Sequence, residues 1–412
     1  MKIIHTADWH IGQLFHEYDR TIEHRDFLDW LCKYLNESDA DVLLISGDIF
    51  DHANPSATSM KLFYSFLNKA TTCNPHLQII VTAGNHDSAS RLEAPKPLIE
   101  SSNIHIVGVV EKTSDGKINY EKIAVPLKNR ANEIKGWCIA APFLKKGDYP
   151  QIKDCENDYS EGIKTFYEEA LQFIKNKNDN TAIIAMGHLH AQNATTSDSD
   201  KVERTIVGGV ECLSAEIFKS EICYVALGHI HKAQRIGGAE HIRYCGSPLP
   251  MSFSEINYKH QLIVFDINDG IVTNINSVEI PIRVNLKSVP ASHKILEEVL
   301  TEIEMMDPYS GHQDYSPYLQ IKVLANGPDP SRRHRIEEAL KDKKFRFVRI
   351  DIKHPEANKR NLEVFTKADL DNLDPVTVFK NAYSKKYNAE APETLLKMFN
   401  NIRNELNENY SA

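Results

Sequence analysis

Three apolar runs in the first hundred residues alternate with two segments of helical periodicity, and this alternation constrains the fold more than any other feature. The runs cover residues 2–7, 41–47 and 77–84. Between them, apolar residues recur at helical spacing over 27–35, and residues 57–70 form a second helix-like segment. Strands that are apolar throughout and joined by helices are typical of a parallel sheet covered on both faces. The pattern therefore predicts an α/β fold.

Further strand-like runs follow, with one long helical segment among them. That helix is predicted over about residues 159–176, and the polar residues 191–204 are predicted to form a loop. The predicted strands, in chain order, are 104–108, 118–127, 136–142, 181–187, 222–228, 241–246, 261–267 and 271–280. This part of the chain is therefore expected to be rich in β structure.

The pattern changes near Pro281, where a small α+β unit is predicted to begin. Its elements are a strand at 283–289, a helix at 292–306, a strand at 318–324, a basic helix at 331–341 and a strand at 345–352. Two amphipathic helices follow, one beginning at Asp374-Pro375 and the other near Pro392. We therefore predict three parts: a domain over 1–280, an α+β domain over 281–355, and a linker with C-terminal helices over 356–412.

Composition excludes several classes of protein. The formal charge of −9 argues against coating nucleic acid through bulk charge, so any such contact needs a local basic patch. No apolar run reaches the ~18 residues that a membrane span needs, and the first residues lack a signal-peptide pattern. The seven cysteines are scattered and form no C-x-x-C, which favours reduced thiols. A cytoplasmic protein that does not enter the membrane is expected.

Ligand-type residues follow five of the predicted strands at the point where each strand ends. They are D-W-H at 8–10, G-D-I-F-D at 47–51, G-N-H-D at 84–87, G-H-L-H at 187–190 and G-H-I-H at 228–231. The carboxyl ends of parallel strands meet at one edge of a sheet, so we expect these clusters to converge. The glycine before each ligand is expected to let the backbone turn sharply.

The kinds of ligand in these clusters indicate which metals they suit. Carboxylate, imidazole and amide oxygen together favour Mn²⁺, Fe²⁺, Co²⁺ or Zn²⁺, whereas Mg²⁺ and Ca²⁺ prefer all-oxygen sites. Two such ions ~3.5–4 Å apart serve in-line attack on phosphorus. The sequence therefore predicts a two-metal site for phosphoryl chemistry.

The ordered set D-x-H, G-D-x-x-D, G-N-H-D, a lone His and G-H-x-H resembles the calcineurin-like metallophosphoesterases. The flanking residues are similar to those of bacterial nuclease subunits of the SbcD family, over H-T-A-D-W-H-I-G at 5–12, G-N-H-D-S-A-S-R-L at 84–92, A-L-G-H-I-H-K-A-Q at 226–234 and Y-C-G-S-P-L-P-M-S-F at 244–253. The resemblance covers essentially the whole chain. It implies a two-sheet β-sandwich flanked by helices, a small α+β capping domain and C-terminal helices.

The same resemblance implies how the metals are held. One metal is assigned to Asp8, His10, Asp48 and His231, and the other to Asp48, Asn85, His188 and His229, with Asp48 bridging. Seven side chains with one shared give four ligands for each metal. His190 is surplus to this count and is expected to begin a polar loop, at best as a supporting or DNA-side residue.

The resemblance further implies that His86 helps protonate the leaving 3′-oxygen and that Asp87 orients its ring. Asp51 and His52 lie just outside the metals, and a phosphate-positioning role and a plain loop role both remain open for them. Protein phosphatases of this superfamily carry an Arg directly after G-D-x-x-D to clamp a phosphomonoester. This chain has His52 there, which favours a phosphodiester substrate.

A basic segment provides the candidate DNA contacts. Residues 331–349 contain eight Lys or Arg against three acids, a net of +5. A DNA-backbone patch and a solvated helix face both fit this pattern. The candidates, together with one Arg beside G-N-H-D, are Arg91, Arg332, Arg333, Arg335, Lys343 and Lys344.

The resemblance implies a Mn²⁺-dependent DNA nuclease acting in DNA repair, recombination and replication. Exonuclease activity is expected on duplex ends, and endonuclease activity on single strands and hairpins. By pattern alone, packing on their own domain also fits the C-terminal helices, but the resemblance implies that they bind an SbcC-like ATPase of the SMC type. This chain has no G-x-x-x-x-G-K-[ST] motif, so any ATP dependence must come from outside the chain. A homodimer through helices near 20–36 and 57–70 is also implied.

Two alternatives compete with the nuclease. One is a small-molecule or cyclic-nucleotide phosphodiesterase of the same superfamily, which has no need of a basic domain or a helical tail. The other is an inactive scaffold, which has no need of a complete ligand set. The sequence leaves open the cleavage polarity, the physiological DNA structure, the metal bound in vivo and the coupling to ATP.

Overall fold

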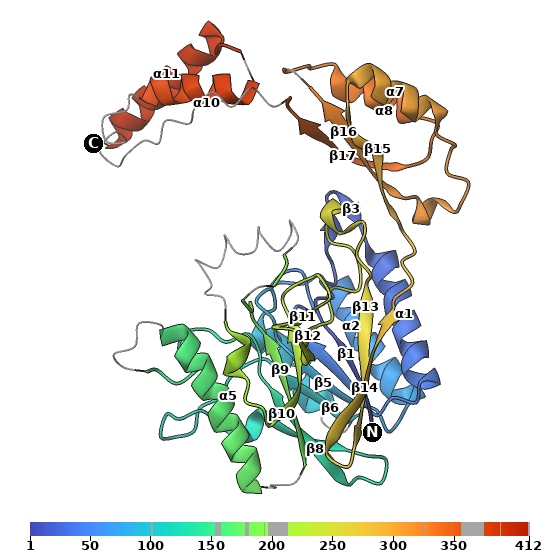
Figure 1. Ribbon diagram of the computed structural model, residues 1–412, viewed down its shortest axis with the longest axis vertical. Coiled ribbons are helices and arrows are strands. Elements are labelled where there is room, and N and C mark those ends of the chain that lie inside the picture. Colours follow the sequence, from blue (N-terminus) through green and yellow to red (C-terminus); the bar gives the residue numbers. More distant parts are fainter. Residues whose placement is uncertain are drawn as a thin grey trace. The chain divides into compact units, whose positions relative to one another are not determined.

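The computed structural model of the chain consists of two compact units, Met1–Arg283 and Val284–Ala412 (Figure 1). It describes all residues except 100–101, 153–157, 178–180, 193, 197–212, 326, 356–374, 388 and 411–412. The predicted linker at 356–374 and most of the loop predicted at 191–204 therefore lie outside the described residues. No helix in the described part of the chain is long and apolar enough to cross a membrane.

The first sheet of the first unit has six strands in the order β14-β13-β1-β4-β5-β6. Their bounds are β1 Lys2–Thr6, β4 Val42–Ser46, β5 Gln78–Thr82, β6 Ile104–Val107, β13 Gln261–Asn268 and β14 Ile271–Glu279. Strands β1, β4, β5 and β6 run parallel, while β13 and β14 are antiparallel to their neighbours. The predicted β-α-β-α-β alternation thus forms the centre of this sheet.

Strand β4 shows why these strands are apolar throughout. All five of its residues are buried. Val42 and Leu44 lie in the apolar layer shared with the second sheet, whereas Leu43 and Ile45 pack with Phe27 of a covering helix. Successive side chains of a strand point to opposite faces, so a strand covered on both faces needs no polar alternation.

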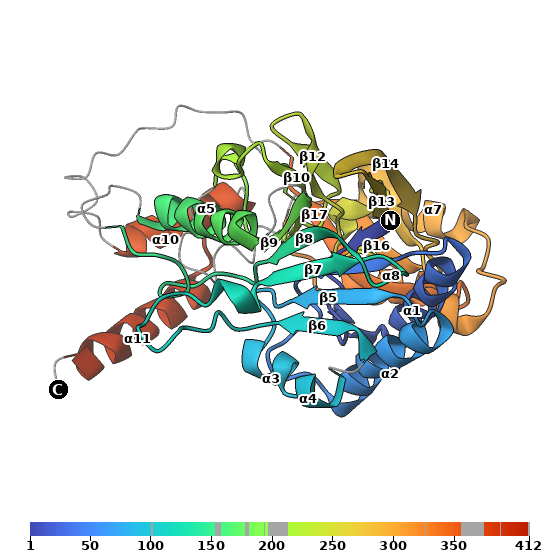
Figure 2. The same cartoon turned by 90° about the horizontal axis from the view of Figure 1, so that it is seen from below.

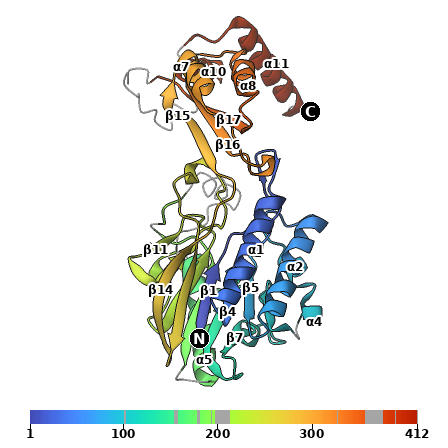
Figure 3. The ribbon, with the colours of Figure 1, turned by 90° about the vertical axis from the view of Figure 1, so that its right-hand side faces the viewer.

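Helices α1 Thr21–Glu37 and α2 Ala57–Cys73 run side by side over the outer face of the first sheet (Figure 3). Shorter elements that the sequence did not predict lie between the main ones. They are the hairpin β2 Leu14–Phe15 and β3 Tyr18–Asp19, and the short helices α3 Ala89–Glu93 and α4 Lys96–Ile99. All four are only two to five residues long, too short to show a periodicity.

The second sheet also has six strands, in the order β11-β12-β10-β9-β8-β7. Their bounds are β7 Ala124–Lys128, β8 Ile134–Ala140, β9 Ala182–His188, β10 Ile222–Gly228, β11 Gln234–Ile236 and β12 Ala239–Tyr244. Helix α5 Asp158–Lys177 packs on its outer face, on the opposite side of the sandwich from α2 (Figure 2). The predicted two-sheet sandwich flanked by helices is confirmed.

The second unit contains a parallel three-stranded sheet, β15-β16-β17. Its strands are β15 Leu286–Lys294, β16 Tyr318–Leu324 and β17 Arg346–Lys353, and apolar side chains of the sheet pack against α7 Leu296–Met305 and α8 Arg332–Leu340. The helix predicted from 292 was wrong at its start. Lys294 still pairs with Val323 beyond a register shift, so the strand continues past Pro290.

Two further helices belong to the second unit, α10 Pro375–Tyr387 and α11 Glu393–Tyr410. The rings of Phe379 and Phe399 stack with centroids 4.5 Å apart and join the two helices. The predicted N-cap at Asp374 lies outside the described residues. Both predicted C-terminal helices are therefore present, with their first described turns at Pro375 and Glu393.

Candidate metal centre

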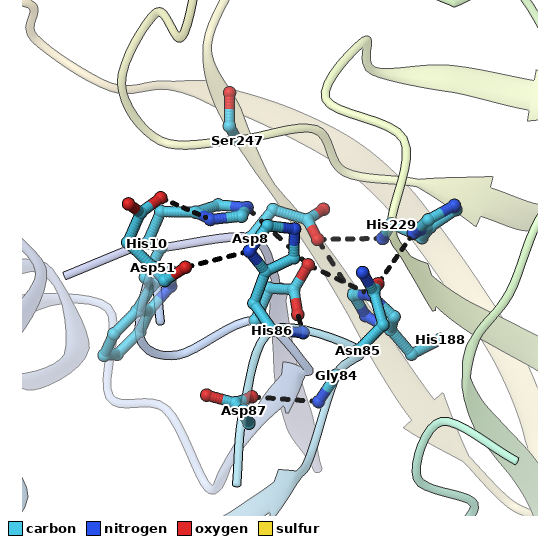
Figure 4. Close-up of polar contacts among 12 residues, drawn as sticks. Asp8, His10, Asp51, Gly84, Asn85, His86, Asp87, His188, His229 and Ser247 are labelled. Carbon is cyan, nitrogen blue, oxygen red and sulfur yellow. Dashed lines mark hydrogen bonds and ion pairs between the residues drawn. The ribbon is translucent and has the colours of Figure 1, made fainter. Parts of the chain in front are cut away.

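The carboxyl ends of β1, β4 and β5 in one sheet meet those of β9 and β10 in the other. Ser46, the last residue of β4, joins the two sheets at this point. Its hydroxyl donates to the Ala226 carbonyl at 3.1 Å, and its own carbonyl lies 3.0 Å from Nδ1 of His188. A carbonyl only accepts, so Nδ1 of His188 carries a proton and Nε2 faces the space between the strand ends (Figure 4).

One ligand group forms around Asn85. Nε2 of His188 lies 2.9 Å from Oδ1 of Asn85 and 3.1 Å from Oδ2 of Asp48. Nδ1 of His229 lies 3.0 Å from the same Asn85 oxygen. Asp48, His188 and His229 each offer a ligand atom, and these atoms lie within 4.8 Å of one another. These four side chains are the ones that the sequence assigned to one metal.

A second group forms around Asp8. Asp8, His10 and His231 offer ligand atoms that lie within 4.8 Å of one another. Nε2 of His10 lies 3.6 Å from Oδ2 of Asp48, so the Asp48 carboxylate stands between the two groups. The seven side chains assigned from the sequence therefore come together in two groups that share Asp48.

Several of these residues adopt backbone conformations that L residues seldom take. The φ angles of Asp8, His10, Asp48 and His229 are 55°, 45°, 49° and 99°. Hydrogen bonds within the site hold two of them: the Asp8 amide donates to the Gly47 carbonyl at 3.1 Å, and the His229 amide donates to Asp8 Oδ1 at 2.8 Å. Such strain is typical of functional sites, where the surrounding contacts compensate for it.

The glycines before the ligands serve two different purposes. Gly47 has a φ of 86°, as a sharp turn requires. Gly84 and Gly228 are not among the glycines with a positive φ, and the close approach of other groups requires glycine there. A Cβ on Gly84 would lie 2.1 Å from Oδ1 of Asp48, and one on Gly228 would lie 1.9 Å from the Ser46 carbonyl oxygen. Close approach of the backbone to a ligand is the second common reason for glycine.

The residues fit a pair of divalent cations. Within the described part of the chain, Oδ2 of Asp8 and Nε2 of His10 are buried and have no hydrogen-bond partner. Oδ2 of Asp48 is buried between Nε2 of His188 and Nε2 of His10, at 3.1 and 3.6 Å. Burying unpaired polar atoms is costly in free energy, and carboxylates remain charged in such a place only when a counter-charge is near. Cations placed between these atoms would satisfy all three.

Comparison with known proteins places this geometry in a family. A model of the calcineurin-like phosphoesterases matches residues 1–233, and a model described as the type 5 capsule protein repressor C-terminal domain matches residues 283–387. The SbcD component of nuclease SbcCD from Rhodobacter capsulatus is 30% identical over 93% of this chain and 94% of its own length. The chain belongs to the SbcD family of calcineurin-like phosphoesterases.

Two further members of the SbcD family are similar to this chain over about two thirds of its length. The SbcD protein of Escherichia coli K12 is 32% identical over 68% of this chain and 69% of its own length. That of Bacillus subtilis 168 is 33% identical over 66% of this chain and 67% of its own length. The chain is therefore a metal-dependent phosphoesterase of the nuclease type.

The buried charged groups of the candidate metal centre shift one another's pKa values strongly. Burial raises the pKa of Asp8 to about 6, against the opposing effect of His188 and His231. Burial acts on Asp48 in the same direction, but the imidazoles of His188 and His10 outweigh it and hold its pKa well below the usual range. Burial lowers the pKa of His188, but the Asp48 and Asp8 carboxylates outweigh it and raise the value to about 9. A bound cation would displace that proton.

His86 lies beside the candidate metal ligands. Its amide donates to Oδ1 of Asp48 at 2.9 Å, and its ring lies 4.9 Å from the ring of His10, centroid to centroid. Its Nδ1 lies 2.8 Å from the Asp51 carbonyl oxygen, so Nδ1 carries a proton. The ring atom that can exchange a proton with a substrate is then Nε2.

Asp87 does not orient the His86 ring, and this part of the prediction is wrong. Its carboxylate accepts hydrogen bonds from the amides of Ile49, Phe50 and Gly84 at 3.1, 3.0 and 2.9 Å. Asp87 thereby fastens the loop after β5 to the loop after β4. The main-chain carbonyl of Asp51 orients the ring of His86 instead.

The Asp51 side chain supports the ligand group around Asp8. Its Oδ1 accepts from Nδ1 of His10 at 3.2 Å, and its Oδ2 lies 3.1 Å from Nε2 of the exposed His52. The bond to His10 leaves Nε2 of that ring for a metal. The sequence left the role of Asp51 open, and the G-D-x-x-D spacing was the only signal for it.

His190 lies in the interior, although a position at the start of a polar loop was expected. Its side chain is buried, and its ring lies edge-on to the ring of His229 with centroids 6.1 Å apart. It belongs to neither of the two ligand groups described above. The residue is therefore a buried neighbour of a ligand.

The candidate DNA contacts are largely engaged within the protein. Arg91 donates to the Asn54 side chain, and Arg332 is buried with Nη2 2.9 Å from the Gly327 carbonyl oxygen. Arg333 and Arg335 pair with Glu337 and Glu297 at 2.7 and 2.8 Å, and Lys343 donates to the carbonyls of Glu304 and Met306. Lys344 is exposed and makes no hydrogen bond or ion pair with any residue that the structure describes.

Proposed function

We propose that this chain is a Mn²⁺-dependent DNA nuclease that hydrolyses phosphodiesters with two metal ions. Asp8, His10, Asp48 and His231 would hold one ion. The other would be held by Asp48, Asn85, His188 and His229. Exonuclease action on duplex ends and endonuclease action on single strands and hairpins belong to the same proposal, as does a cytoplasmic role in DNA repair and recombination.

The observation that carries the proposal is the meeting of two buried ligand groups at one shared carboxylate. Oδ2 of Asp48 lies 3.6 Å from Nε2 of His10 and 3.1 Å from Nε2 of His188. The mixture of imidazole, carboxylate and amide oxygen supports Mn²⁺ over Mg²⁺. Two ions bound there would polarise the phosphodiester and activate a water molecule for in-line attack.

His86 would supply the proton that the leaving oxygen needs. Its Nδ1 is held by the Asp51 carbonyl, so its Nε2 is directed away from that loop. The adjacent Asp48 and Asp51 carboxylates would stabilise the protonated ring. A positioned imidazole of this kind contributes about 10²- to 10⁴-fold to the rate.

The SbcD relatives are named as components of a complex, SbcCD, and we propose that this chain assembles likewise with an SbcC-like ATPase. The C-terminal helices α10 and α11 are the proposed contact. Val378, Met398 and Ile402 are exposed on them, at 45%, 62% and 55%. Exposed apolar side chains of this kind support a binding surface for another protein.

A homodimer through α1 and α2, and DNA contacts from Arg91, Lys344 and the remaining basic residues near α8, complete the proposal. An exposed groove lined by Arg25, Leu62 and Lys69 separates α1 from α2 and is compatible with such a contact. For the basic residues, the internal pairing of Arg333 and Arg335 leaves Lys344 as the best-supported contact.

The test is cleavage of end-labelled duplex and hairpin DNA by the full chain with Mn²⁺, with and without the ATPase partner. His86→Gln should lower the rate by about 10²- to 10⁴-fold while both ions remain bound. The amide of residue 86 that donates to Asp48 survives the change. The exposed neighbour His52 provides the matched control, and His52→Gln should cleave like the wild type.

Two outcomes would contradict the proposal. Turnover of a cyclic nucleotide by a wild type that leaves DNA intact in the presence of the partner would favour a small-molecule phosphodiesterase. Loss of bound metal in His86→Gln would make His86 a ligand. That second outcome has a structural basis, since His86, His10 and Asp48 offer ligand atoms within 4.8 Å of one another.

A further inference from the structure

The segment Y-C-G-S at 244–247 has no role in the function proposed above, yet it contacts both G-H-x-H sequences. Tyr244 is the last residue of β12 and pairs with Leu227 of β10, just before the second of them. In the sheet, β10 lies between β12 and β9, the strand that leads into the first. The segment therefore reaches both strand ends that supply histidines to one metal.

The Tyr244 hydroxyl holds the first of the two sequences. It donates to the Leu189 carbonyl at 2.6 Å and accepts from the Ala191 amide at 2.9 Å. The side chain is buried, and β9 ends at His188. The two main-chain groups lie beyond the strand, so the hydroxyl replaces the sheet partners that a longer strand would have given them.

The turn after Tyr244 holds the second sequence. The Ser247 amide donates to the His231 carbonyl at 3.1 Å, and Nδ1 of His260 donates to the Ser247 carbonyl at 2.8 Å. Gly246 has a φ of 82°, and a Cβ there would lie 2.7 Å from the His231 carbonyl oxygen. The turn thus lies directly against the backbone of His231.

These contacts matter because one proposed metal takes His188 from the end of β9 and His229 from the end of β10. The distance between those two strand ends therefore sets the geometry of that site. We infer that Tyr244 is a positioning residue for the metal site of His188 and His229, fixing the His188 segment relative to β10 through its hydroxyl. The inference rests on the two-metal site of the proposed function.

Calorimetric titration of the full chain with Mn²⁺ tests the inference without any substrate. The wild type should show two binding steps. The step that disappears in His188→Ala belongs to the metal of the His188–His229 site. Tyr244→Phe should weaken that step by about tenfold or more, the usual effect of losing a group that orients a ligand, and leave the other step unchanged. Raising Mn²⁺ should restore the kcat of Tyr244→Phe on bis(p-nitrophenyl) phosphate.

Tyr224→Phe is the matched control. Tyr224 is as deeply buried as Tyr244, but its hydroxyl lies 3.1 Å from Nδ1 of His5, a residue outside both G-H-x-H sequences. It should retain both steps at wild-type affinity. Thermal unfolding followed by circular dichroism verifies that each variant is folded.

Four results separate the possibilities. Wild-type affinity at both steps in a folded Tyr244→Phe would overturn the inference, and so would equal weakening in Tyr224→Phe, because the effect would then be general. A wild type that binds two ions but leaves DNA intact would overturn the proposed nuclease and not the role of Tyr244. Selective weakening of the step that His188→Ala abolishes would support the inference whatever the substrate proves to be.

Discussion

Charged side chains are concentrated both at the strand ends of the first unit and on helix α8 of the second, but the two regions differ in how these side chains are buried and paired. At the strand ends, the acids and imidazoles are buried, and Oδ2 of Asp8 and Nε2 of His10 have no hydrogen-bond partner in the described structure. On α8, the exposed Arg333 and the half-buried Arg335 are paired with acids of their own domain. The sequence alone ranks both regions as candidate binding sites.

This difference indicates that buried polar atoms without hydrogen-bond partners are stronger evidence for a bound ligand than a high density of charged side chains. A buried polar atom without a partner costs about 1–3 kcal/mol, more if charged, so a fold retains several of them together only where a ligand compensates. Exposed ion pairs contribute little to stability and are common on any surface. The strand ends therefore carry the functional argument, and α8 gives only weak support to the proposed DNA contact.

The largest effect should come from disturbing the shared carboxylate without removing it. Gly84→Ala would place a Cβ 2.1 Å from Oδ1 and 2.3 Å from the amide nitrogen of Asp48. We expect Asp48 to move, both ions to be lost, and DNA cleavage to fall by about 10³-fold or more, since metal ions supply several kcal/mol of transition-state stabilisation. Metal analysis and cleavage assays measure this.

Gly327→Ala is the matched control, because a Cβ on Gly327 meets no described atom within 4 Å. It should bind two ions and cleave DNA normally. A Gly84→Ala protein with both ions and full activity would show that the close approach of the loop after β5 to Asp48 is irrelevant. The contrast between the strand ends and α8 would then lose its structural basis.

A smaller effect is expected from the residue that orients His10. Asp51→Asn removes the negative charge 3.2 Å from Nδ1 of His10 and should weaken the ion held by Asp8, His10 and His231 by about 10- to 100-fold. The His86 ring is held by the main-chain carbonyl of residue 51, so cleavage should recover at saturating Mn²⁺. Calorimetry and the Mn²⁺ dependence of the rate measure both effects.

His52→Asn is the comparison for this prediction. His52 is the other partner of the Asp51 carboxylate, and its side chain is 78% exposed. Its substitution should leave the metal affinity unchanged. If Asp51→Asn bound Mn²⁺ as tightly as the wild type, the His10–Asp51 hydrogen bond would be dispensable.

Acid should destabilise the first unit through its buried histidines. Burial lowers the pKa of His260 to about 4, although its hydrogen bond to the Ser247 carbonyl acts in the opposite direction. Between about pH 6.5 and pH 4, His260 binds a proton in the unfolded chain but stays neutral in the folded chain. The contribution of His260 to folding stability is therefore complete above about pH 6.5 and is lost as the pH falls toward 4. At pH 5 the loss is about 2 kcal/mol.

Urea unfolding of the metal-free chain at pH 7 and pH 5 measures this loss. His260→Gln has no imidazole to protonate at this position, so its stability should fall less over the same interval. Identical pH dependence in the wild type and in His260→Gln would mean that His260 does not contribute to acid sensitivity.

Much of the site could be predicted from local sequence. The strands before Asp8, Asp48 and Asn85 are apolar on both faces, so their ends can be read directly, and parallel strands bring such ends to one edge. The short strands and helices around them could not be predicted. Elements as short as Leu14–Phe15 depend on tertiary contacts for their stability.

The wrong assignments share a physical cause, which is contact between distant parts of the chain. Asp87 was assigned to its neighbour His86, but its carboxylate binds amides of Ile49 and Phe50 from another loop. The charge of Arg335 is compensated by Glu297, which is 38 residues away. A single sequence shows the charges and not their partners, so pairing is what the structure adds.

The smallest effect concerns α8 and decides between a DNA contact and a solvated face. Lys344 has no partner in the described structure, whereas Nη2 of Arg335 lies 2.8 Å from a carboxylate oxygen of Glu297. Lys344→Ala should reduce the slope of log affinity against log salt by about 1, the value for one phosphate contact. Arg335→Ala should leave the slope unchanged, because its charge already has a partner. Fluorescence anisotropy of labelled duplex DNA at several salt concentrations measures both slopes. Equal slopes in the wild type and both variants would make the basic residues of α8 and its neighbourhood an ordinary solvated surface, and DNA binding would then have to come from the first unit.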